Sequence, residues 1–335
     1  MKTIRIGNPA TLDSLAVHDE ATPQPGAGEI LVKAGASSLN FHDYLVVTGA
    51  LPAAEGRIPM SDVAGEVAET GEGVTEFAVG DLVMGTFFPT WLAGEATMAN
   101  TWGCIPGDSI EGYAREYVTG AQQAFTRTPA GYSVEEAATL PCAALTAWRA
   151  LFVEGGLQAG ETVLVQGTGG VSIFALQLAK AVGATVIATS SSDAKLEKVT
   201  ALGADHTINY KDTPEWGKAA AKLCPRGGVD HIIEVGGPNT LAQSLDAVRT
   251  GGHISMIGVL TGWAGEVPTA KLMAKQVKVK GITVGTREHQ LEMVAGLENL
   301  QIKPVIDKSF ALEDIADAFR HQESQQHFGK ICLSY

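Results

Sequence analysis

The middle of the chain alternates strand-like and helix-like segments, and this alternation constrains the fold more than any other feature. Between residues 162 and 257, short apolar runs are separated by stretches in which apolar side chains recur with helical spacing. Such alternation is typical of βαβ units, which assemble into a parallel sheet with helices on both faces. The predicted strands are Thr162–Gln166, Thr185–Thr189, His206–Tyr210, Asp230–Val235 and His253–Ile257. The predicted helices are Val171–Val182, Asp193–Leu202, Glu215–Leu223, Thr240–Val248 and Pro268–Lys275, and Ile282–Val284 is expected to be the last strand.

A glycine-rich turn follows the first of these strands and opens the first helix. Its sequence is Gly167-Thr168-Gly169-Gly170-Val171-Ser172. In a dinucleotide site, the first glycine makes the tight turn, the second lets the backbone approach the pyrophosphate, and the third packs the helix against the strand. The phosphates then meet the free N–H groups at the helix N-terminus. Ser172 stands at the third position, and glycine-rich turns also occur for purely structural reasons, but the flanking strand and helix favour dinucleotide binding.

The end of the second strand bears on which dinucleotide is bound. NAD-binding units usually place Asp or Glu there to hold the ribose 2′-OH, whereas this chain has Thr189-Ser190-Ser191-Ser192. Serine hydroxyls can donate to a 2′-phosphate, Lys195 can neutralise it, and Tyr210 can add a further hydroxyl. The serines can also cap the next helix, with Lys195 as a solvated cation. The pattern favours NADPH over NADH.

Residues that follow the later strands are expected to contact the nicotinamide half of the cofactor. Ligands bind beyond the carboxyl ends of parallel strands, which predicts contacts from Val235, Gly236, Gly258 and Val259. Further candidates on the nicotinamide side are Gly285 and Arg287, although Arg287 can equally be a surface cation.

Composition and charge narrow the functional classes. The 335 residues are 45% hydrophobic, which supports a sizeable core, and the formal net charge is -13. A surface with this charge repels nucleic acid and anionic lipid, so neither is an expected partner. The four cysteines form no CxxC pair, which argues against a disulfide framework. The N-terminal residues lack the apolar region of a signal peptide, and we expect a cytoplasmic protein with no membrane partner.

Further motifs resemble those of the medium-chain dehydrogenase/reductases, and the likeness covers nearly the whole chain. They are Gly28-Glu29-Ile-Leu-Val-Lys, Gly65-Glu66-Val67, Val79-Gly80-Asp81-Leu-Val, Glu135-Glu136-Ala-Ala-Thr-Leu-Pro and Ala204-Asp205-His206-Thr207-Ile-Asn-Tyr210. The resemblance implies an α/β protein with a partly closed β-barrel-like catalytic domain and an inserted Rossmann domain, a doubly wound parallel sheet. We place the catalytic domain at residues 1–127 and 286–335, and the dinucleotide-binding domain at residues 128–285. The resemblance also implies an active site between the domains and a homodimer.

Within that family, the chain looks like a member of the zinc-independent branch, similar to quinone oxidoreductases. Asn40 stands where zinc-dependent members carry a cysteine, and Met60-Ser61-Asp62 stands where they carry Gly-His-Glu. Only Cys142 matches a position for a third zinc ligand, and one thiol cannot replace a tetrahedral set. The segment from Phe87 to Ser109, expected to be a long loop, contains only Cys104, so the resemblance implies no structural zinc either.

Candidate catalytic residues follow from this comparison. His42 occupies the place of the proton-relay hydroxyl of zinc-dependent relatives and can donate a proton near neutral pH. Asn40 can donate its amide to the substrate or to the nicotinamide ribose. Each has a structural alternative, His42 as a hydrogen-bonded surface or core histidine and Asn40 as a loop-stabilising residue. Asp43 is expected to be a structural acceptor, and Thr146 matches a cofactor-contacting hydroxyl of the family.

An apolar substrate pocket is predicted at Phe87, Phe88 and Trp91, with Trp102 as a further candidate, although these rings can equally pack the loop onto its domain. Without a metal to polarise a ketone, hydride transfer to a conjugated carbonyl is easier because the charge spreads onto an enolate oxygen. The sequence therefore predicts an NADPH-dependent, zinc-free oxidoreductase that acts on a small electrophile, a quinone or an α,β-unsaturated carbonyl. The alternatives are an NADP-dependent alcohol dehydrogenase or ketone reductase of the same fold, and a non-catalytic NADPH-binding sensor or structural protein.

Overall fold

The computed structural model describes residues 1–335, which form two compact units. Unit 1 comprises residues 1–145 and 284–335, and unit 2 comprises residues 146–283. The segment 128–145, which the sequence assigned to the dinucleotide-binding domain, therefore belongs to unit 1. Its helix α3 (Val134–Ala138) packs against strands of the unit 1 sheet, and this packing explains the difference.

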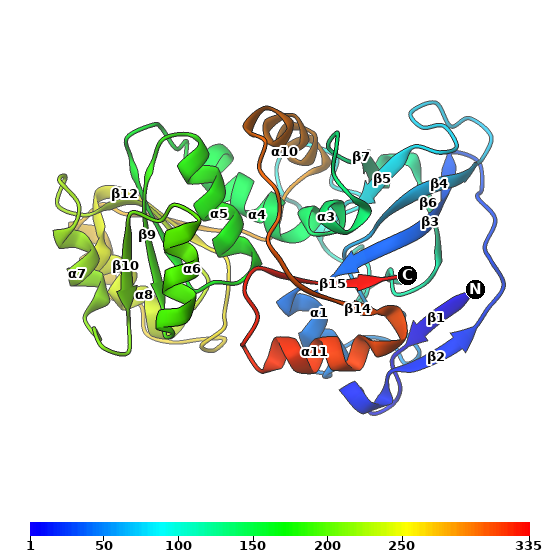
Figure 1. Ribbon diagram of the computed structural model, residues 1–335, viewed down its shortest axis with the longest axis horizontal. Helices are drawn as coiled ribbons and strands as arrows, with labels where there is room; N and C mark the ends of the chain where they lie inside the picture. Colours follow the sequence, from blue (N-terminus) through cyan, green and yellow to red (C-terminus); the bar gives the residue numbers. More distant parts are fainter. The chain divides into compact units, whose positions relative to one another are not determined.

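Unit 2 is built on a six-stranded parallel sheet, as the alternation of strands and helices predicted (Figure 1). The strand order is β10-β9-β8-β11-β12-β13. The order reverses between β8 and β11, which is the point where doubly wound sheets bind their ligands. The bounds are β8 Thr162–Gln166, β9 Thr185–Ser190, β10 His206–Asn209, β11 Val229–Glu234, β12 Val248–Met256 and β13 Lys278–Gly281.

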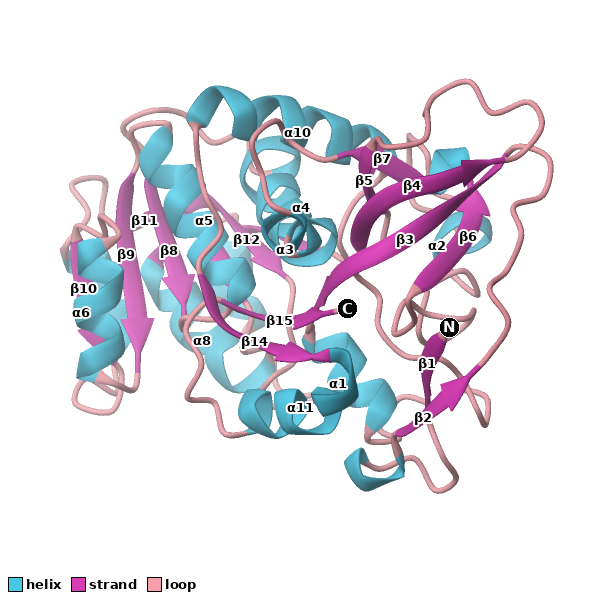
Figure 2. Ribbon diagram, turned by 45° about the vertical axis from the view of Figure 1, so that its right-hand side comes forward, coloured by secondary structure: helices cyan, strands magenta, loops and turns pink.

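Helices cover both faces of this sheet, which buries its central strands completely. Helices α5 (Gly170–Ala181) and α6 (Asp193–Ala201) pack against β8, β9 and β10. Helices α7 (Trp216–Lys222) and α8 (Pro238–Ala247) contribute to a separate apolar core with β8, β11 and β12 on the opposite face (Figures 1 and 2). Every residue of β8 and β11 is buried, as expected for strands covered on both faces. Unit 2 also contains α9 (Thr269–Ala274), a π-helical segment at Arg149–Glu154 and most of α4 (Leu145–Trp148).

Unit 1 contains a mixed sheet whose order is β14-β15-β3-β4-β5-β7, with β6 also paired to β3 (Figure 2). The long strand β3 (Glu29–Ser38) organises this sheet because it pairs with β4, β6 and β15. One apolar core underlies it, formed by the sheet, α1, α11 and the N-terminal segment. The other strands are β1 Lys2–Arg5, β2 Ala16–Asp19, β4 Ala64–Thr70, β5 Leu82–Gly85, β6 Tyr117–Ala121, β7 Phe125–Arg127, β14 Ile306–Ala311 and β15 Lys330–Ser334. The other helices are α1 Phe41–Val47, α2 Met98–Thr101, α10 Arg287–Leu300 and α11 Ile315–Glu323, with a π-helical segment at Leu140–Ala144.

One expectation about strands is wrong, and one strand was missed. The last strand of unit 2 is β13 at Lys278–Gly281 and not Ile282–Val284. All four residues of β13 are exposed at the sheet edge and two of them are lysines, so this strand lacks the apolar signature of a buried one. The strand β14 was not predicted at all, because only Ile306 and Phe310 of its side chains are partly buried.

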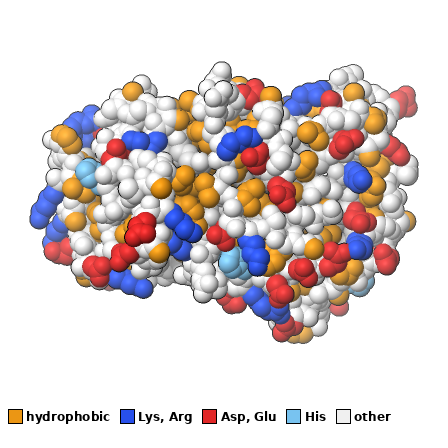
Figure 3. Space-filling view, in the orientation of Figure 1, with side chains coloured by type: hydrophobic (Ala, Val, Ile, Leu, Met, Phe, Trp, Pro, Cys, Tyr) orange, Lys and Arg blue, Asp and Glu red, His pale blue; other side chains and the backbone are white.

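The expected absence of nucleic-acid and lipid partners stays a prediction. Acidic and basic side chains are interspersed on the face of the molecule shown in Figure 3. No helix is long and apolar enough to cross a membrane.

Candidate functional site

The glycine-rich turn lies at the carboxyl end of β8, beside the reversal of strand order. Gly167 has a φ of +69°, a left-handed conformation that favours glycine, and its N–H donates to Thr189 O at 2.8 Å. Gly169 is the N-cap of α5, and a side chain there would meet no protein atom within 4 Å. Packing within the protein therefore does not explain Gly169, and the predicted approach of phosphates to this backbone stays a prediction.

Ser172 takes the place of the third glycine without separating the helix from the strand. Its hydroxyl donates to Gln166 O at 2.6 Å, and the side chain is buried. The serine thus bonds the first turn of α5 to the last residue of β8. This departure from the glycine pattern is compatible with the close packing that the third glycine normally allows.

The ends of β9 and β10 bring together two of the predicted 2′-phosphate contacts. Ser190 ends β9, and Tyr210 follows β10 and donates its N–H to Ser190 O at 3.1 Å. The Ser190 hydroxyl accepts from Ser192 N at 3.2 Å, so the serines also shape the entry to α6. Lys195 lies in the first turn of α6, on the same edge of the sheet. The N-cap residue Ser192 makes no side-chain capping hydrogen bond, so the capping alternative is not observed, and the contact with a 2′-phosphate stays a prediction.

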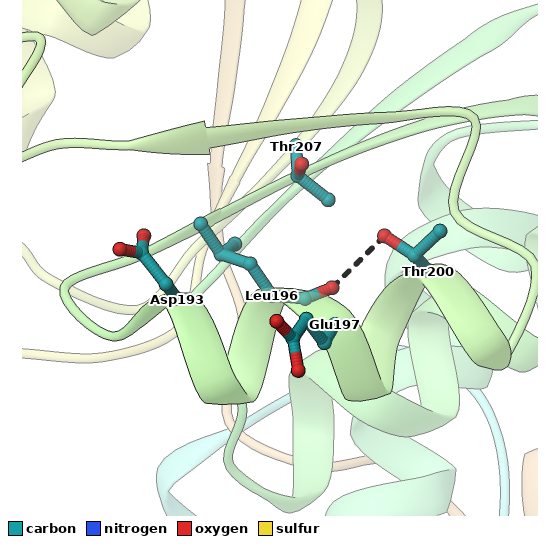
Figure 4. Close-up of a pocket in the computed structure, with 5 residues that line it drawn as sticks. All are labelled: Asp193, Leu196, Glu197, Thr200 and Thr207. Carbon is teal, nitrogen blue, oxygen red and sulfur yellow. Dashed lines mark hydrogen bonds between the residues drawn. The ribbon is translucent and has the colours of Figure 1, made fainter.

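A shallow hollow between α6 and β10 is a different feature. It is lined by Asp193, Leu196, Glu197, Thr200 and Thr207 from α6 and β10 (Figure 4). Two of its five side chains are carboxylates, and the Thr200 hydroxyl donates to Leu196 O at 2.9 Å within the helix. An anionic cofactor is not suited to this hollow.

In unit 1, the residues around Asn40 form a buried polar cluster. The Asn40 side chain donates to Asp62 Oδ2 at 2.8 Å and to Ser61 Oγ at 3.3 Å. Asp43 accepts from the backbone N–H groups of Asn40 and Ser61, each at 2.9 Å, which confirms it as a structural acceptor. Both amide N–H groups of Asn40 are engaged within unit 1, so donation to a substrate would require this cluster to rearrange. The geometry favours the structural alternative for Asn40.

The cation of this cluster is Lys330, the first residue of β15. Its ammonium donates to Asn40 Oδ1 at 2.6 Å and to Leu39 O at 2.7 Å, and it lies 3.8 Å from Asp62 Oδ2. Lys330 is 4% exposed and Asp62 is fully buried. Burial raises the pKa of Asp62 to about 6, although Lys330 and the Asn40 amide oppose this rise. A buried ammonium therefore balances the carboxylate at neutral pH.

His42 lies between two carboxylates. Its Nε2 is 3.0 Å from Asp108 Oδ2, and its Nδ1 is 3.7 Å from Asp43 Oδ1. Burial alone would lower the pKa of His42, but the hydrogen bond to Asp108 and the charge of Asp43 outweigh it and raise the pKa to about 9. His42 is therefore an imidazolium at neutral pH, able to donate a proton.

The aromatic residues of the predicted substrate pocket pack on one another. Phe87, Phe88 and Trp91 form successive edge-to-face contacts, with centroid separations of 4.9 and 5.6 Å, and all three are buried. The rings of His42 and Phe87 form a T-shaped contact with their centroids 5.4 Å apart. Trp102, by contrast, is 72% exposed, so it does not belong to this group. The pocket itself stays a prediction, and the packing of the rings onto unit 1 is the feature that is observed.

Three other residues that were predicted to contact the cofactor lie close in sequence to the points where the two units divide, after residues 145 and 283. Thr146 is buried in α4, and its proposed contact stays a prediction. A side chain at Gly285 would approach Leu145 and His289 of unit 1, so local packing explains this glycine. Arg287 pairs with Glu76 and donates to Phe125 O at 3.1 Å. The guanidinium of Arg287 is thus engaged within unit 1 and is not a solvated surface cation, and its cofactor contact stays a prediction.

Sequence reasoning missed three residues that the structure places in polar contacts: Asp108 beside His42, and Gln166 and Glu234, which are hydrogen-bonded to each other. Asp108 lies in the long loop, and nothing in the sequence links it to His42. Glu234 ends β11, where it resembles any polar strand end, and Gln166 ends β8 in the same way. Their position next to the reversal of strand order is the signal that could have singled them out.

Known proteins resemble this chain over its whole length. Residues 26–130 match the family profile described as "Alcohol dehydrogenase GroES-like domain", and residues 170–299 match the one described as "Zinc-binding dehydrogenase". A zinc-type alcohol dehydrogenase-like protein of Schizosaccharomyces pombe is 42% identical over 331 residues, covering 96% of this chain and 95% of that protein. An acryloyl-coenzyme A reductase of Sulfurisphaera tokodaii is 27% identical, covering 99% of each chain.

Solved structures agree with these sequence matches. The crystal structure of a putative alcohol dehydrogenase from Sinorhizobium meliloti has a TM-score of 0.92 at 39% identity, covering 100% of this chain and 99% of that one. An NAD-dependent alcohol dehydrogenase has a TM-score of 0.90 at 31% identity, covering 100% of both chains. A mycobacterial protein complexed with NADPH has a TM-score of 0.84 at 25% identity, also covering 100% of both chains. A nicotinamide cofactor is therefore supported, whereas the choice between NAD and NADP is left open by these neighbours.

Zinc, which the description of one profile implies, does not suit the donor set of the Asn40 cluster. Zinc binds deprotonated thiols, imidazoles and carboxylates. Burial raises the pKa of Cys142 well above its ordinary value, so its thiol keeps its proton. The Asn40 amide and the Ser61 hydroxyl replace stronger ligands, and the Lys330 ammonium already supplies a positive charge. No group of three or more His, Cys, Asp or Glu side chains that could hold a metal ion is found in the chain.

The charge balance of the Asn40 cluster can be tested by a double-mutant cycle. Lys330→Met leaves Asp62 as an unpaired buried charge, and we expect it to lower the free energy of unfolding by roughly 3–5 kcal/mol at pH 7.5. Lys330→Met/Asp62→Asn should recover part of this loss. The folded-state pKa of Asp62 is raised, so its protonation below about pH 6 favours the folded state and should shrink the defect of Lys330→Met at pH 5. Urea denaturation at both pH values measures these effects, and a defect that is equal at both would contradict the assignment.

Proposed function

The chain belongs to the medium-chain dehydrogenase/reductase family, and we propose that it is an NADPH-dependent member that transfers hydride without zinc to a quinone or an α,β-unsaturated carbonyl. The observation that supports this proposal is the buried ammonium of Lys330 beside Asn40 and Asp62. By the family resemblance, Asn40 and the Met60–Asp62 segment stand where zinc-dependent members carry metal ligands. A conjugated acceptor suits such a site, because the negative charge that follows hydride addition spreads onto an enolate oxygen and needs no Lewis acid. The similarity to an acryloyl-coenzyme A reductase supports the same acceptor class.

The preference for NADPH rests on the β9–α6 edge of unit 2. Ser190 and Tyr210 lie side by side there, and no carboxylate ends β9 to repel a 2′-phosphate. Lys195 supplies a cation in the first turn of α6. The glycine-rich turn at Gly167 and Gly169 would hold the pyrophosphate at the N-terminus of α5. The cofactor, when bound, supplies a hydride from its nicotinamide ring.

A second candidate is a ketone reductase or alcohol dehydrogenase, which the names of several relatives favour. A third is an NADPH-binding protein without catalytic activity. The homodimer stays a prediction, for which the exposed edge strand β13 is the element available to pair with a second copy.

The acceptor class and the metal requirement can be tested together. With NADPH, the purified protein should reduce quinones or enones in preference to simple ketones, and its activity should survive chelation because no residue of the Asn40 cluster requires a metal. Metal analysis should find zinc well below one equivalent per chain. A full equivalent of zinc that survives chelation, or turnover of simple ketones alone, would contradict the proposal. Tight NADPH binding without turnover of any electrophile would favour the third candidate.

The cofactor preference can be tested at Lys195. NADPH should bind more tightly than NADH, and Lys195→Ala should reduce that preference by about tenfold, because a charge-assisted bond to the 2′-phosphate is lost. Lys198→Ala, on the same helix one turn later, is the matched control and should leave the preference unchanged. Titration of intrinsic fluorescence with each cofactor provides the measurement. Full retention of the preference in Lys195→Ala would show that the 2′-phosphate site lies elsewhere.

His42 is proposed as the proton donor of the reaction, with Asp108 keeping it charged. The wild-type rate should fall as pH rises through about 9, where the imidazolium loses its proton. Asp108→Asn should move this fall to lower pH, because the hydrogen bond that raises the pKa of His42 is weakened. His42→Gln should slow turnover roughly a hundredfold, and Glu95→Gln, an exposed carboxylate of the same loop, is the control. Stopped-flow profiles in which His42→Gln keeps the wild-type rate would return His42 to its structural alternative.

A further inference from the structure

The end of β11 carries a buried carboxylate whose partners are all uncharged. Glu234 is 0% exposed, and its oxygens accept five hydrogen bonds. Oε1 accepts from the backbone N–H groups of Gly236 and Gly237, each at 2.9 Å, and from Thr240 Oγ1 at 2.6 Å. Oε2 accepts from Gln166 Nε2 at 2.7 Å and from Ser244 Oγ at 2.5 Å. A side chain with only acceptors fits five donors, whereas an amide at this position would place one N–H group against another.

These bonds determine the shape of two turns at the carboxyl edge of the sheet. The first turn, residues 235–237, follows β11, and both of its glycine N–H groups point to Glu234 Oε1. The second turn, residues 258–261, follows β12 and lies against the first, because Thr261 N and Thr261 Oγ1 both donate to Gly236 O at 2.9 Å. The contact is so close that a side chain at Gly258 would come within 2.2 Å of Val235 O. The position of the second turn therefore depends on the first.

The same network reaches the strand that carries the glycine-rich turn. Gln166 ends β8, and its Oε1 accepts from the backbone N–H groups of Val235 and Gly236 at 3.3 and 3.2 Å. Glu234 and Gln166 thus join the two strands on either side of the reversal of strand order. In a doubly wound sheet, the adenosine half of the cofactor lies toward β9, so the nicotinamide half lies toward β11 and β12.

We propose that Glu234 is a positioning residue for the nicotinamide half of the cofactor, because its carboxylate holds the 235–237 turn, and through it the 258–261 turn, in the shape that receives the ring. This inference rests on the proposed binding of NADPH. Hydride transfer is sensitive to small displacements of the ring, and a rigid, fully hydrogen-bonded support limits such displacements. Glu234 itself lies beneath the turns and need not touch the cofactor.

The test compares two ligands on a matched set of variants. NADP+ carries the nicotinamide, and 2′-phospho-ADP-ribose lacks it, so only NADP+ should sense the two turns. Glu234→Gln should weaken NADP+ at least about tenfold, the effect expected when a hydrogen bond to a buried charged group is lost. Its Kd for 2′-phospho-ADP-ribose should stay within about twofold of the wild type. Glu215→Gln, at an exposed position, should change neither Kd.

An exchange variant provides the rescue. In Gln166→Glu/Glu234→Gln, the acceptor-only side chain moves to β8 and the amide moves to β11. The amide can then donate to the new carboxylate and to Ser244, while its oxygen accepts from Gly236, Gly237 and Thr240. Every hydrogen bond of the network is retained, so the affinity for NADP+ should return to near the wild-type value, and the KM for NADPH with it.

Each outcome decides the proposal. If Glu234→Gln weakens the binding of both ligands equally, the carboxylate supports the sheet in general and the inference is wrong. Unchanged binding of both ligands would also overturn the inference. If Glu234→Gln does not fold, Thr240→Val removes one donor to Oε1 and should show the same selective loss for NADP+ on a smaller scale; equal loss for the two ligands, or none, would count against the proposal. Failure of the wild type to bind 2′-phospho-ADP-ribose would instead contradict the proposed NADPH preference.

Discussion

The reversal of strand order between β8 and β11 is the constraint on which the proposed cofactor site depends. Where parallel strands are covered by helices on both faces, their turns and free backbone groups lie at the strand ends. The reversal of strand order separates the turns that follow β8 and β11 at the carboxyl ends of these strands. Glycine-rich turns follow these strands, and side-chain hydrogen bonds of Gln166 and Glu234 attach them to the sheet. The hydrogen bonds of Gln166 and Glu234 thereby hold these turns in a fixed position relative to the strands.

In unit 1, the central feature is a buried carboxylate with a buried ammonium beside it. A carboxylate at Asp62 would be costly to bury alone, and Lys330 supplies the compensating charge from β15, far away in the sequence. Asn40 lies between them, accepting from the ammonium and donating to the carboxylate. The Lys330 ammonium is a covalently attached cation, and it cannot coordinate a substrate oxygen as a Lewis acid. The proposed preference for conjugated acceptors rests on this property of the cluster.

The elements of unit 2 could be predicted from the sequence because their signals are local. The strand at Thr162–Gln166 was predicted at its observed bounds, and α5 to α9 were each placed within two residues at either end. The failures share one cause. The strand β13 is exposed and carries lysines, and β14 presents mostly exposed side chains, so neither has an apolar pattern, and only pairing with a neighbouring strand defines them. The point near Leu145 where the chain divides into two units could not be predicted from the sequence either, because it depends on the strands against which α3 packs.

By itself, the sequence determined the fold class and the glycine-rich turn, since each depends on residues close together along the chain. The tertiary structure alone decided what those residues do to one another. It brought Lys330 to Asn40, Asp108 to His42 and Gln166 to Glu234, across separations of 290, 66 and 68 residues. It also showed that the turn at Gly167 belongs to a larger set of turns at the carboxyl ends of the strands. There Ser172 stands in place of the third glycine, and its hydroxyl bonds the helix to the strand. Charge compensation and hydrogen-bond complementarity act through space, and a linear pattern does not record them.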